Sequence, residues 1–524
     1  MKIAIGTDGE GDRALNEANR EGGGVHFTKA EASLTAADRV QMEGRSVRLV
    51  SVLTADLWGL EATLLEVLVG AAGWDRAKGT VQDRAWMAAK HEGLAVGMRR
   101  GFSTVPAPRS LPDGVELAVA VGFCVGPELS LSGYLFWGTV SLSGELRPVR
   151  GAFPVAELAA REGKVLVVPS SLEAEARLAG GRVLAASTLK ELVRWVSSHT
   201  SETTAAALGE GTCTFGGGDA RPFVSLDLAD VRGNEKAVRA LEVAAAGRHS
   251  LLLRGVPGAG KTMLARRLVD LLPPMTGEEV LDVVRIRSVA GLLDPKRSVT
   301  RQRPFRAPHH TISTTGLLGG FAPARPGEVS LATHGVLFLD ELPEFRGETI
   351  DALRVAIAEG KHRVVRLGRS ASFPARPLLV AATNPCPCGY LGSSRECRCV
   401  SRAIDSHRAR VKRLSFELDV EVHRMTHEEL ASAPMAATTA AVAARVVKAA
   451  ETRREACIEA RARSARGLLP LLPAELRIAR GEAEERGRVA VAGVARTIAC
   501  LAGDVVLRDA HMEEALELAA WGRP

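Results

Sequence analysis

One short segment constrains this chain more than any other, because it fits a phosphate-binding loop at every fixed position. It reads Gly255-Val256-Pro257-Gly258-Ala259-Gly260-Lys261-Thr262. The apolar residues 251–253 before it predict a buried strand, and the amphipathic residues 263–272 after it predict a helix. Glycines let backbone N–H groups approach phosphate oxygens, and the N-terminus of the helix attracts anions. The segment therefore predicts an ATP site, with Lys261 on the β- and γ-phosphates and the Thr262 hydroxyl on Mg²⁺.

Two later segments are typical of further parts of the same site. Residues 335–339 are apolar and predict a buried strand that ends at two carboxylates, Asp340 and Glu341. Residues 378–383 predict a second buried strand, which ends at Asn384. Downstream of a phosphate loop, Asp340 is expected to help hold Mg²⁺ and Glu341 to polarise the attacking water. Asn384 is expected to orient that water, although an asparagine in this place can also serve only to cap a turn.

The order of predicted strands and helices divides the chain into several domains, as its length of 524 residues favours. Residues 1–199 mix both kinds of element and predict an α/β or α+β domain. Residues 200–222 are polar and glycine-rich and predict a linker. Residues 223–425 alternate strand and helix, which predicts an α/β core with helices beside the sheet. Residues 426–524 have almost no strand pattern and predict a helical domain.

Within the first domain, short apolar runs and amphipathic runs suggest particular elements. Residues 117–121 and 165–169 are apolar and predict buried strands. Residues 172–178 and 189–196 predict helices.

Charge and hydropathy narrow the choice of partners and location. The net charge is +7 and the isoelectric point is near 9.1, which fits a polyanionic partner such as nucleic acid. Arginine-rich solvated faces also explain the same balance. The sequence has no apolar run long enough to span a membrane, and its first residues do not have the pattern of a signal peptide. We therefore expect a cytoplasmic protein with no membrane partner.

A cluster of cysteines follows Asn384. Its members are Cys386, Cys388, Cys397 and Cys399. A tetrahedral Zn²⁺ takes four thiolates, and such a site would be structural because no ligand position stays open for water. The pairs are spaced C-x-C, which is shorter than the usual spacing, so zinc ligands and free cytosolic thiols both remain open interpretations.

Several longer motifs resemble the YifB/ComM family, often described as magnesium chelatase-like. They are Arg303-Pro304-Phe305-Arg306-Ala307-Pro308-His309-His310-Thr311, residues 326–332 and 335–345, Asn384-Pro385-Cys386-Pro387-Cys388-Gly389-Tyr390 and residues 494–503. The resemblance implies an AAA+ ATPase: a P-loop core, a helical C-terminal lid and a Lon-protease-like N-terminal domain. It also implies a ring-shaped homo-oligomer, a hexamer in ComM-type members, which move DNA branches during natural transformation.

The resemblance also implies roles for particular residues. Arg486 falls where the lid arginine of the family contacts the γ-phosphate. The segment with Arg303, Arg306, His309 and His310 falls where the family has an inserted hairpin near the central channel. These four side chains are expected to contact DNA phosphates, or alternatively to support the nucleotide site or the neighbouring subunit.

Two departures from the family pattern carry predictions of their own. Ser415 stands where family members have the arginine finger that acts across the subunit interface, and Arg408, Arg410 or Arg413 could substitute for it. This departure predicts weakened turnover but intact ATP binding. The Lon-like domain is matched at residues 138–151. The resemblance places the serine and the lysine that proteolysis needs near residues 112–116 and just after Gly151, but residues 112–116 contain no serine and residues 152–155 no lysine, so we expect the domain to be non-proteolytic.

The leading hypothesis is an ATPase that couples hydrolysis to DNA remodelling. One alternative is a motor subunit for inserting magnesium into a tetrapyrrole. Chelatase motors usually lack a Lon-like domain, which argues against this alternative. The other alternative is a degenerate paralogue that binds nucleotide and serves as a regulator or scaffold, which Ser415 supports.

Overall fold

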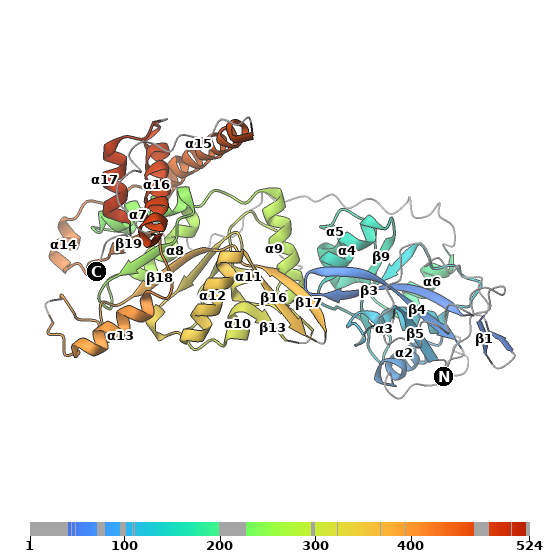
Figure 1. Ribbon diagram of the computed structural model, residues 1–524. Coiled ribbons are helices and arrows are strands. Elements are labelled where there is room, and N and C mark those ends of the chain that lie inside the picture. Colours follow the sequence, from blue (N-terminus) through green and yellow to red (C-terminus); the bar gives the residue numbers. More distant parts are fainter. Residues whose placement is uncertain are drawn as a thin grey trace. The chain divides into compact units, whose positions relative to one another are not determined.

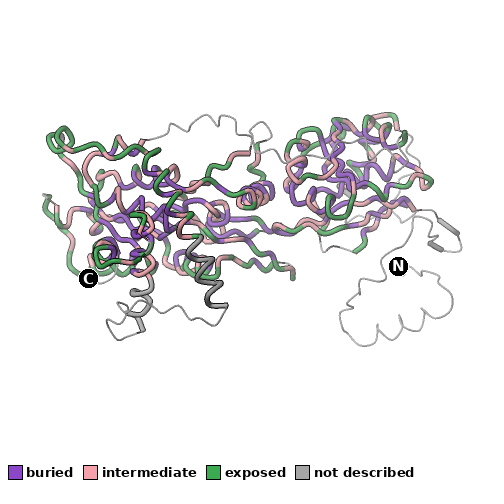
Figure 2. The backbone as a smooth tube through the Cα atoms, turned by 90° about the horizontal axis from the view of Figure 1, so that it is seen from above, coloured by how far each residue is buried: buried purple, intermediate pink, exposed green. Residues whose placement is uncertain are grey.

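The chain forms two compact units, each with its own hydrophobic core (Figures 1 and 2). The first comprises residues 1–214 and 287–297, and the second residues 215–286 and 298–524. The sequence did not suggest that residues 287–297 group with the first unit. The computed structural model describes residues 40–42, 45–47, 49–70, 79–94, 101–106, 108, 110–198, 227–294, 299–321, 323–366, 368–393, 395–465, 482–504 and 506–519. The expected linker at 200–222 lies outside these residues.

The first unit is built on a mixed six-stranded sheet in the order β10-β9-β6-β3-β4-β5. The pairs from β10 to β3 are parallel, and the pairs from β3 to β5 are antiparallel. The strands are β3 (Val50–Trp58), β4 (Glu61–Gly70), β5 (Gly101–Val105), β6 (Tyr134–Phe136), β9 (Val165–Pro169) and β10 (Val183–Ala186). The helices are α2 (Gly79–His91), α3 (Val115–Cys124), α4 (Ala152–Arg161), α5 (Glu173–Arg177) and α6 (Leu189–Ser198).

One sequence prediction in this unit was wrong. Residues 117–121, expected as a strand, lie in α3, whose residues from Val115 to Phe123 are all buried. A helix covered on every side has no polar face, so its apolar run has the same pattern as a buried strand. The strand at 165–169 and the helix at 189–196 are present as β9 and α6.

The second unit is built on a parallel five-stranded sheet in the order β12-β15-β18-β11-β19. Parallel sheets are covered on both faces, which explains why their strands read as continuous apolar runs. The strands are β11 (Leu251–Arg254), β12 (Phe305–Arg306), β15 (Val336–Leu339), β18 (Leu378–Thr383) and β19 (Leu418–Glu421). This α/β arrangement fits the expected AAA+ core.

Helices and two hairpins complete this part of the unit. The helices are α7 (Glu235–Gly247), α8 (Lys261–Leu271), α9 (Gly277–Ala290), α10 (Thr314–Leu318), α11 (Glu328–Leu331), α12 (Gly347–Glu359) and α13 (Ser401–Val411). The hairpins are β13 (Gly319–Gly320) with β14 (Arg325–Pro326) and β16 (Lys361–Arg366) with β17 (Arg369–Pro374).

The C-terminal residues are helical. They form α14 (His427–Ser432), α15 (Thr439–Ala465), α16 (Glu482–Ala502) and α17 (Asp509–Leu518). Val446 of α15 and Val494 of α16 are fully buried in the same core as the strand β11. Glu242 of α7 is almost fully buried and binds Arg239 at 2.7 Å and Arg445 of α15 at 2.7 Å. The described part of the chain contains no helix both long and apolar enough to span a bilayer.

Candidate nucleotide site

The three segments singled out in the sequence meet at one edge of the parallel sheet. The strand β11 leads into the phosphate loop, β15 ends just before Asp340, and β18 ends just before Asn384. Because β18 lies between β11 and β15 and all three are parallel, their carboxyl ends lie side by side. Ligands of open parallel sheets bind at this edge.

Lys261 is held at the centre of this edge. Its Nζ donates to the carbonyl oxygens of Gly255 at 2.6 Å and Val256 at 3.1 Å, and to Asn384 Oδ1 at 2.9 Å. These acceptors are uncharged, so they orient the ammonium group without neutralising it. Burial lowers the pKa of Lys261, while the nearby carboxylates of Asp340 and Glu341 oppose that change. The site therefore presents a positive charge beside the backbone N–H groups of the loop.

A hydroxyl and a carboxylate lie together beside this lysine. Thr262 Oγ1 donates to Asp340 Oδ2 at 2.8 Å, and Asp340 Oδ1 accepts from the backbone N–H of Glu341 at 3.0 Å. Hard oxygen donors of this kind are the ligands that Mg²⁺ prefers, usually together with phosphate oxygens and water. The residues present therefore fit a Mg²⁺–nucleotide complex, with Thr262 and Asp340 as the protein ligands.

Glu341 has a backbone conformation that few residues adopt. Its φ is +52°, in the left-handed region, and its side chain is 55% exposed. Its Oε2 lies 3.6 Å from His310 Nδ1, and the ring centroids of His310 and His309 are 4.1 Å apart, with the rings tilted by 34°. Both histidines therefore lie beside the nucleotide site. This favours the supporting role that the sequence left open for them over contact with DNA.

The two arginines of the same segment also have partners within the unit. Arg303 is 8% exposed; its Nη2 lies 3.1 Å from Glu279, and it donates to backbone carbonyls, including that of His334. Arg306 makes two hydrogen bonds to Glu328, at 2.6 and 2.7 Å. Breaking such pairs to reach a phosphate would leave carboxylates partly buried without a counter-charge. These contacts again favour a structural role.

Several predicted arginine roles stay predictions. Arg486 lies in α16, but its side chain is outside the described residues. Ser415 is exposed. Of the proposed substitutes for the arginine finger, Arg410 donates to the Pro343 carbonyl and Arg413 binds Asp351 at 2.7 Å. Arg408 lies exposed on α13.

The four cysteines come together, although they are separated along the chain. All four sulfurs lie within 4.8 Å of one another. Cys386 Sγ lies 3.4 Å from Cys388 Sγ and 3.6 Å from Cys397 Sγ, and Cys388 and Cys397 are 3.6 Å apart. Four sulfurs bound to zinc at ~2.3 Å in a tetrahedron would be ~3.8 Å apart. The backbone N–H of Leu391 also donates to Cys386 Sγ. The arrangement fits the zinc interpretation.

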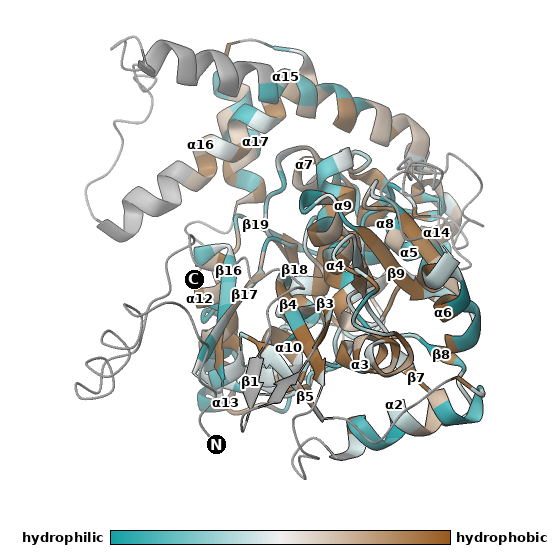
Figure 3. Cartoon of the chain, turned by 90° about the vertical axis from the view of Figure 1, so that its right-hand side faces the viewer, coloured by the Kyte–Doolittle hydropathy of each residue, from teal (hydrophilic) through white to brown (hydrophobic). Residues whose placement is uncertain are grey.

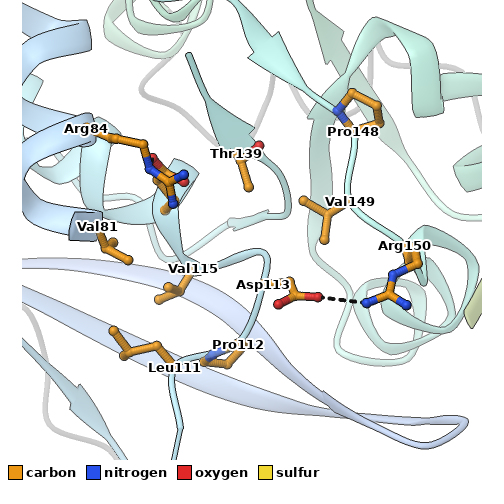
Figure 4. A pocket seen from close by; sticks show the side chains of 11 residues that line it. Val81, Arg84, Leu111, Pro112, Asp113, Val115, Thr139, Pro148, Val149 and Arg150 are labelled. Carbon is orange, nitrogen blue, oxygen red and sulfur yellow. Dashed lines mark hydrogen bonds and ion pairs between the residues drawn. The ribbon is translucent and has the colours of Figure 1, made fainter. Parts of the chain in front are cut away.

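The first unit has a pocket of about 390 Å³ beside residues 112–116 (Figure 4). It is lined by Asp113 and Arg150, whose side chains pair at 3.2 Å, and by the buried Glu116. Arg84 Nε lies 2.9 Å from Glu116 Oε1. No serine or lysine is among the described residues that line the pocket. The lack of peptidase activity remains a prediction.

Comparison with known proteins identifies the family. An uncharacterized protein of Mycobacterium tuberculosis is 37% identical over 397 residues, 73% of this chain and 75% of that protein. The competence protein ComM of Haemophilus influenzae is 39% identical over 295 residues, 54% of this chain and 56% of its own length. YifB of Escherichia coli is 40% identical over 300 residues, covering 56% and 57% respectively.

The chain belongs to the YifB/ComM family. In addition, residues 227–430 match the family described as magnesium chelatase, subunit ChlI. That match covers the parallel sheet and the whole nucleotide edge described above. Membership of this magnesium chelatase-like family indicates an AAA+ ATPase-type motor that uses ATP and Mg²⁺.

Proposed function

We propose that this protein hydrolyses ATP and uses the energy to remodel DNA. The observation that carries the hydrolytic part is that two hydrogen-bonded pairs, Lys261 with Asn384 and Thr262 with Asp340, meet at one edge of the sheet. A site that served only to bind nucleotide would not require the second carboxylate, Glu341, next to the magnesium ligand Asp340. It would also not require the Asn384 amide beside Lys261.

Each residue has a distinct role in the proposed reaction. Bound ATP supplies the phosphoanhydride bond, and Lys261 and Thr262 hold its phosphates and Mg²⁺ in place. Glu341, exposed and next to Asp340, accepts a proton from the attacking water. Asn384 positions that water opposite the bond that breaks. His310, 3.6 Å from Glu341, limits the directions in which this carboxylate can turn.

The proposal includes a ring of identical subunits, a hexamer as in ComM-type members, located in the cytoplasm. Within such a ring, Arg408 is the candidate to reach the neighbouring nucleotide site, because Arg410 and Arg413 are engaged with Pro343 and Asp351. An arginine supplied by a neighbour makes turnover depend on assembly.

The DNA part of the proposal is supported by the ComM relationship and by a basic hairpin that sequence reasoning missed. Strands β16 and β17 carry five basic residues and, from Lys361 to Pro374, no acidic residue. Much of the hairpin, above all β16, is coloured as hydrophilic in Figure 3. The basic residues are Lys361, His362, Arg363, Arg366 and Arg369. Their density over a short stretch is the signal that could have found them.

The two faces of this hairpin differ. Val364, Ala371 and Phe373 are buried on one face. Lys361, Arg363 and Val365 alternate with them and are exposed, opposite Pro374, Ser372 and Ser370. Arg366 pairs with Arg369 next to the turn. Arginine, lysine and serine side chains are those that most often contact phosphates. We therefore assign DNA contact to this face rather than to Arg303 and Arg306.

ATPase turnover with and without branched DNA, together with DNA binding over a range of salt concentrations, tests the proposal. Lys361→Gln with Arg363→Gln should weaken DNA binding and reduce the slope of log K against log salt by about 0.9 for each duplex phosphate that the protein no longer neutralises. Arg161→Gln, which removes an exposed arginine of the first unit, is the matched control. If the slope of log K against log salt is unchanged in the variant, the hairpin does not contact DNA. If the wild type does not bind DNA, DNA is not the partner.

The match to the magnesium chelatase subunit favours a second candidate function, a motor for inserting magnesium into a tetrapyrrole. ATPase activity that ignores DNA but rises with a tetrapyrrole-binding partner would favour it. A nucleotide-binding scaffold predicts ATP binding without turnover. We also propose a structural Zn²⁺ at the four cysteines, in addition to ATP and Mg²⁺.

A further inference from the structure

The cysteine loop, residues 386–399, connects two elements that hold Asn384. On one side, Asn384 is separated from Cys386 only by Pro385. On the other side, α13 begins at Ser401, and its His407 Nε2 lies 2.9 Å from the Asn384 carbonyl oxygen, which accepts the bond. The position of Asn384 therefore depends on where both ends of the cysteine loop are held.

The same loop touches the phosphate loop. Gly389 has a φ of +82°, and a Cβ added to it would lie 2.7 Å from both Cδ and Cγ of Pro257. Real side chains almost never approach so closely, so only glycine fits here without a shift. The backbone of the cysteine loop is thus packed directly against the loop that receives the phosphates.

The cysteine loop has little of its own to keep it folded. Among its described residues only Cys386 and Gly389 are buried, so it lacks an apolar core. A segment with few buried contacts opens easily, because little apolar burial offsets the entropy lost when its backbone is ordered. One ion bound to four thiolates would supply the missing constraint, as in small zinc-dependent folds.

We infer that Zn²⁺ at these cysteines positions the γ-phosphate end of the nucleotide site, by clamping the cysteine loop against Pro257 and holding Asn384 beside Lys261. The inference rests on the zinc proposed above. It makes the cysteines positioning residues: they do not touch the nucleotide, but they set the geometry of two groups that do. Loss of the metal should therefore impair turnover more than ATP binding.

The first experiment removes the metal by changing the two cysteines that are farther from Asn384 in the sequence. Full-length Cys397→Ser with Cys399→Ser should lose the zinc, which metal analysis of the wild type purified without chelator should find at about one per chain. Hydrogen exchange of the amides of residues 255–262 should become at least about tenfold faster. Cys500→Ser, which changes a cysteine outside the loop, is the control and should match the wild type.

The second experiment keeps all four cysteines and disturbs only the contact. Gly389→Ala should keep its zinc but push against Pro257, speed exchange in residues 255–262 and lower kcat, on the order of 100-fold for a displacement of about 1 Å. Gly392→Ala is the matched control, since this glycine has a φ of +77° but a Cβ there would meet nothing within 4 Å. Both variants carry similar backbone strain, so any difference between them in exchange rate or kcat reports the contact of residue 389 with Pro257.

The outcomes separate the proposals. Wild-type protein without zinc would overturn the metal site. Zinc retained in Gly389→Ala, with exchange and kcat equal to those of Gly392→Ala, would overturn the positioning role. If the wild type has no ATPase activity, the proposed hydrolysis fails, while metal content and exchange in residues 255–262 still decide this inference.

Discussion

Glu116 should make the stability of the first unit fall as pH rises. This residue of α3 is 2% exposed, and burial is the main reason that its pKa is raised from 4.5 to about 7. The charge and hydrogen bond of Arg84 lower the pKa only in part. Below about pH 4.5 the side chain is neutral in both states. Between the two pKa values the folded chain holds a proton that the unfolded chain has released, so stability declines as pH rises through 7.

The size of the effect follows from the shift. A change from 4.5 to about 7 is 2.5 pKa units, and each unit corresponds to about 1.36 kcal/mol, giving about 3 kcal/mol. Glu116→Gln keeps the shape of the side chain and removes its titration. Near pH 4.5 the free energy of unfolding of the variant should equal that of the wild type or be slightly lower. By pH 8 it should exceed that of the wild type by about 3 kcal/mol.

Tryptophan fluorescence during urea unfolding of the full chain is a suitable assay. Five of the six tryptophans, at positions 58, 74, 86, 137 and 195, lie in the first unit. The contributions of the other titrating groups cancel when the free energy of unfolding of the wild type is subtracted from that of the variant. Glu162→Gln, at an exposed position of the same unit, is the matched control. If the free energies of unfolding of Glu116→Gln and the wild type differ by the same amount at pH 4.5 and at pH 8, the reasoning is refuted.

Three further predictions concern other parts of the molecule. Lys261→Ala should abolish ATP binding, measured with a fluorescent nucleotide, whereas Glu341→Gln should bind ATP and release phosphate at least about 100-fold more slowly; equal ATP affinity of Lys261→Ala and wild type would contradict the phosphate-loop assignment. Glu242→Ala leaves Arg239 and Arg445 without their shared carboxylate, so it should destabilise the docking of α15 by about 3 kcal/mol. Hydrogen exchange in residues 439–454 measures this loss, and unchanged protection would show that the ion pairs do not hold the helix. Finally, the protein should not cleave peptides, and peptidase activity that survives in purified Lys261→Ala protein would disprove this.

The nucleotide edge could be predicted because its chemistry depends on local spacing. A strand, a glycine-rich loop and a helix in sequence create a phosphate site wherever they occur, since the backbone groups that bind phosphate belong to consecutive residues. Strands ending at Asp340 and Asn384 were equally visible, because parallel strands are buried on both faces and read as unbroken apolar runs. The longer motifs then indicated the family, which the comparisons confirmed.

Features that depend on which surfaces meet were decided only by the tertiary structure. Residues 117–121 form part of a helix because the surrounding sheet and helices cover every side of them, a fact that local hydropathy does not contain. The motif that contains Arg303 left both DNA contact and a supporting role open, and the pairing of Arg303 with Glu279 of α9 favours the supporting role. The spacing of the cysteines left zinc undecided, while their sulfur-to-sulfur distances favour it. The sequence determines which chemical groups are present and what residues close together in the chain can bind. Long-range packing determines which charged side chains are neutralised within the protein, and so which charged side chains remain to bind a partner.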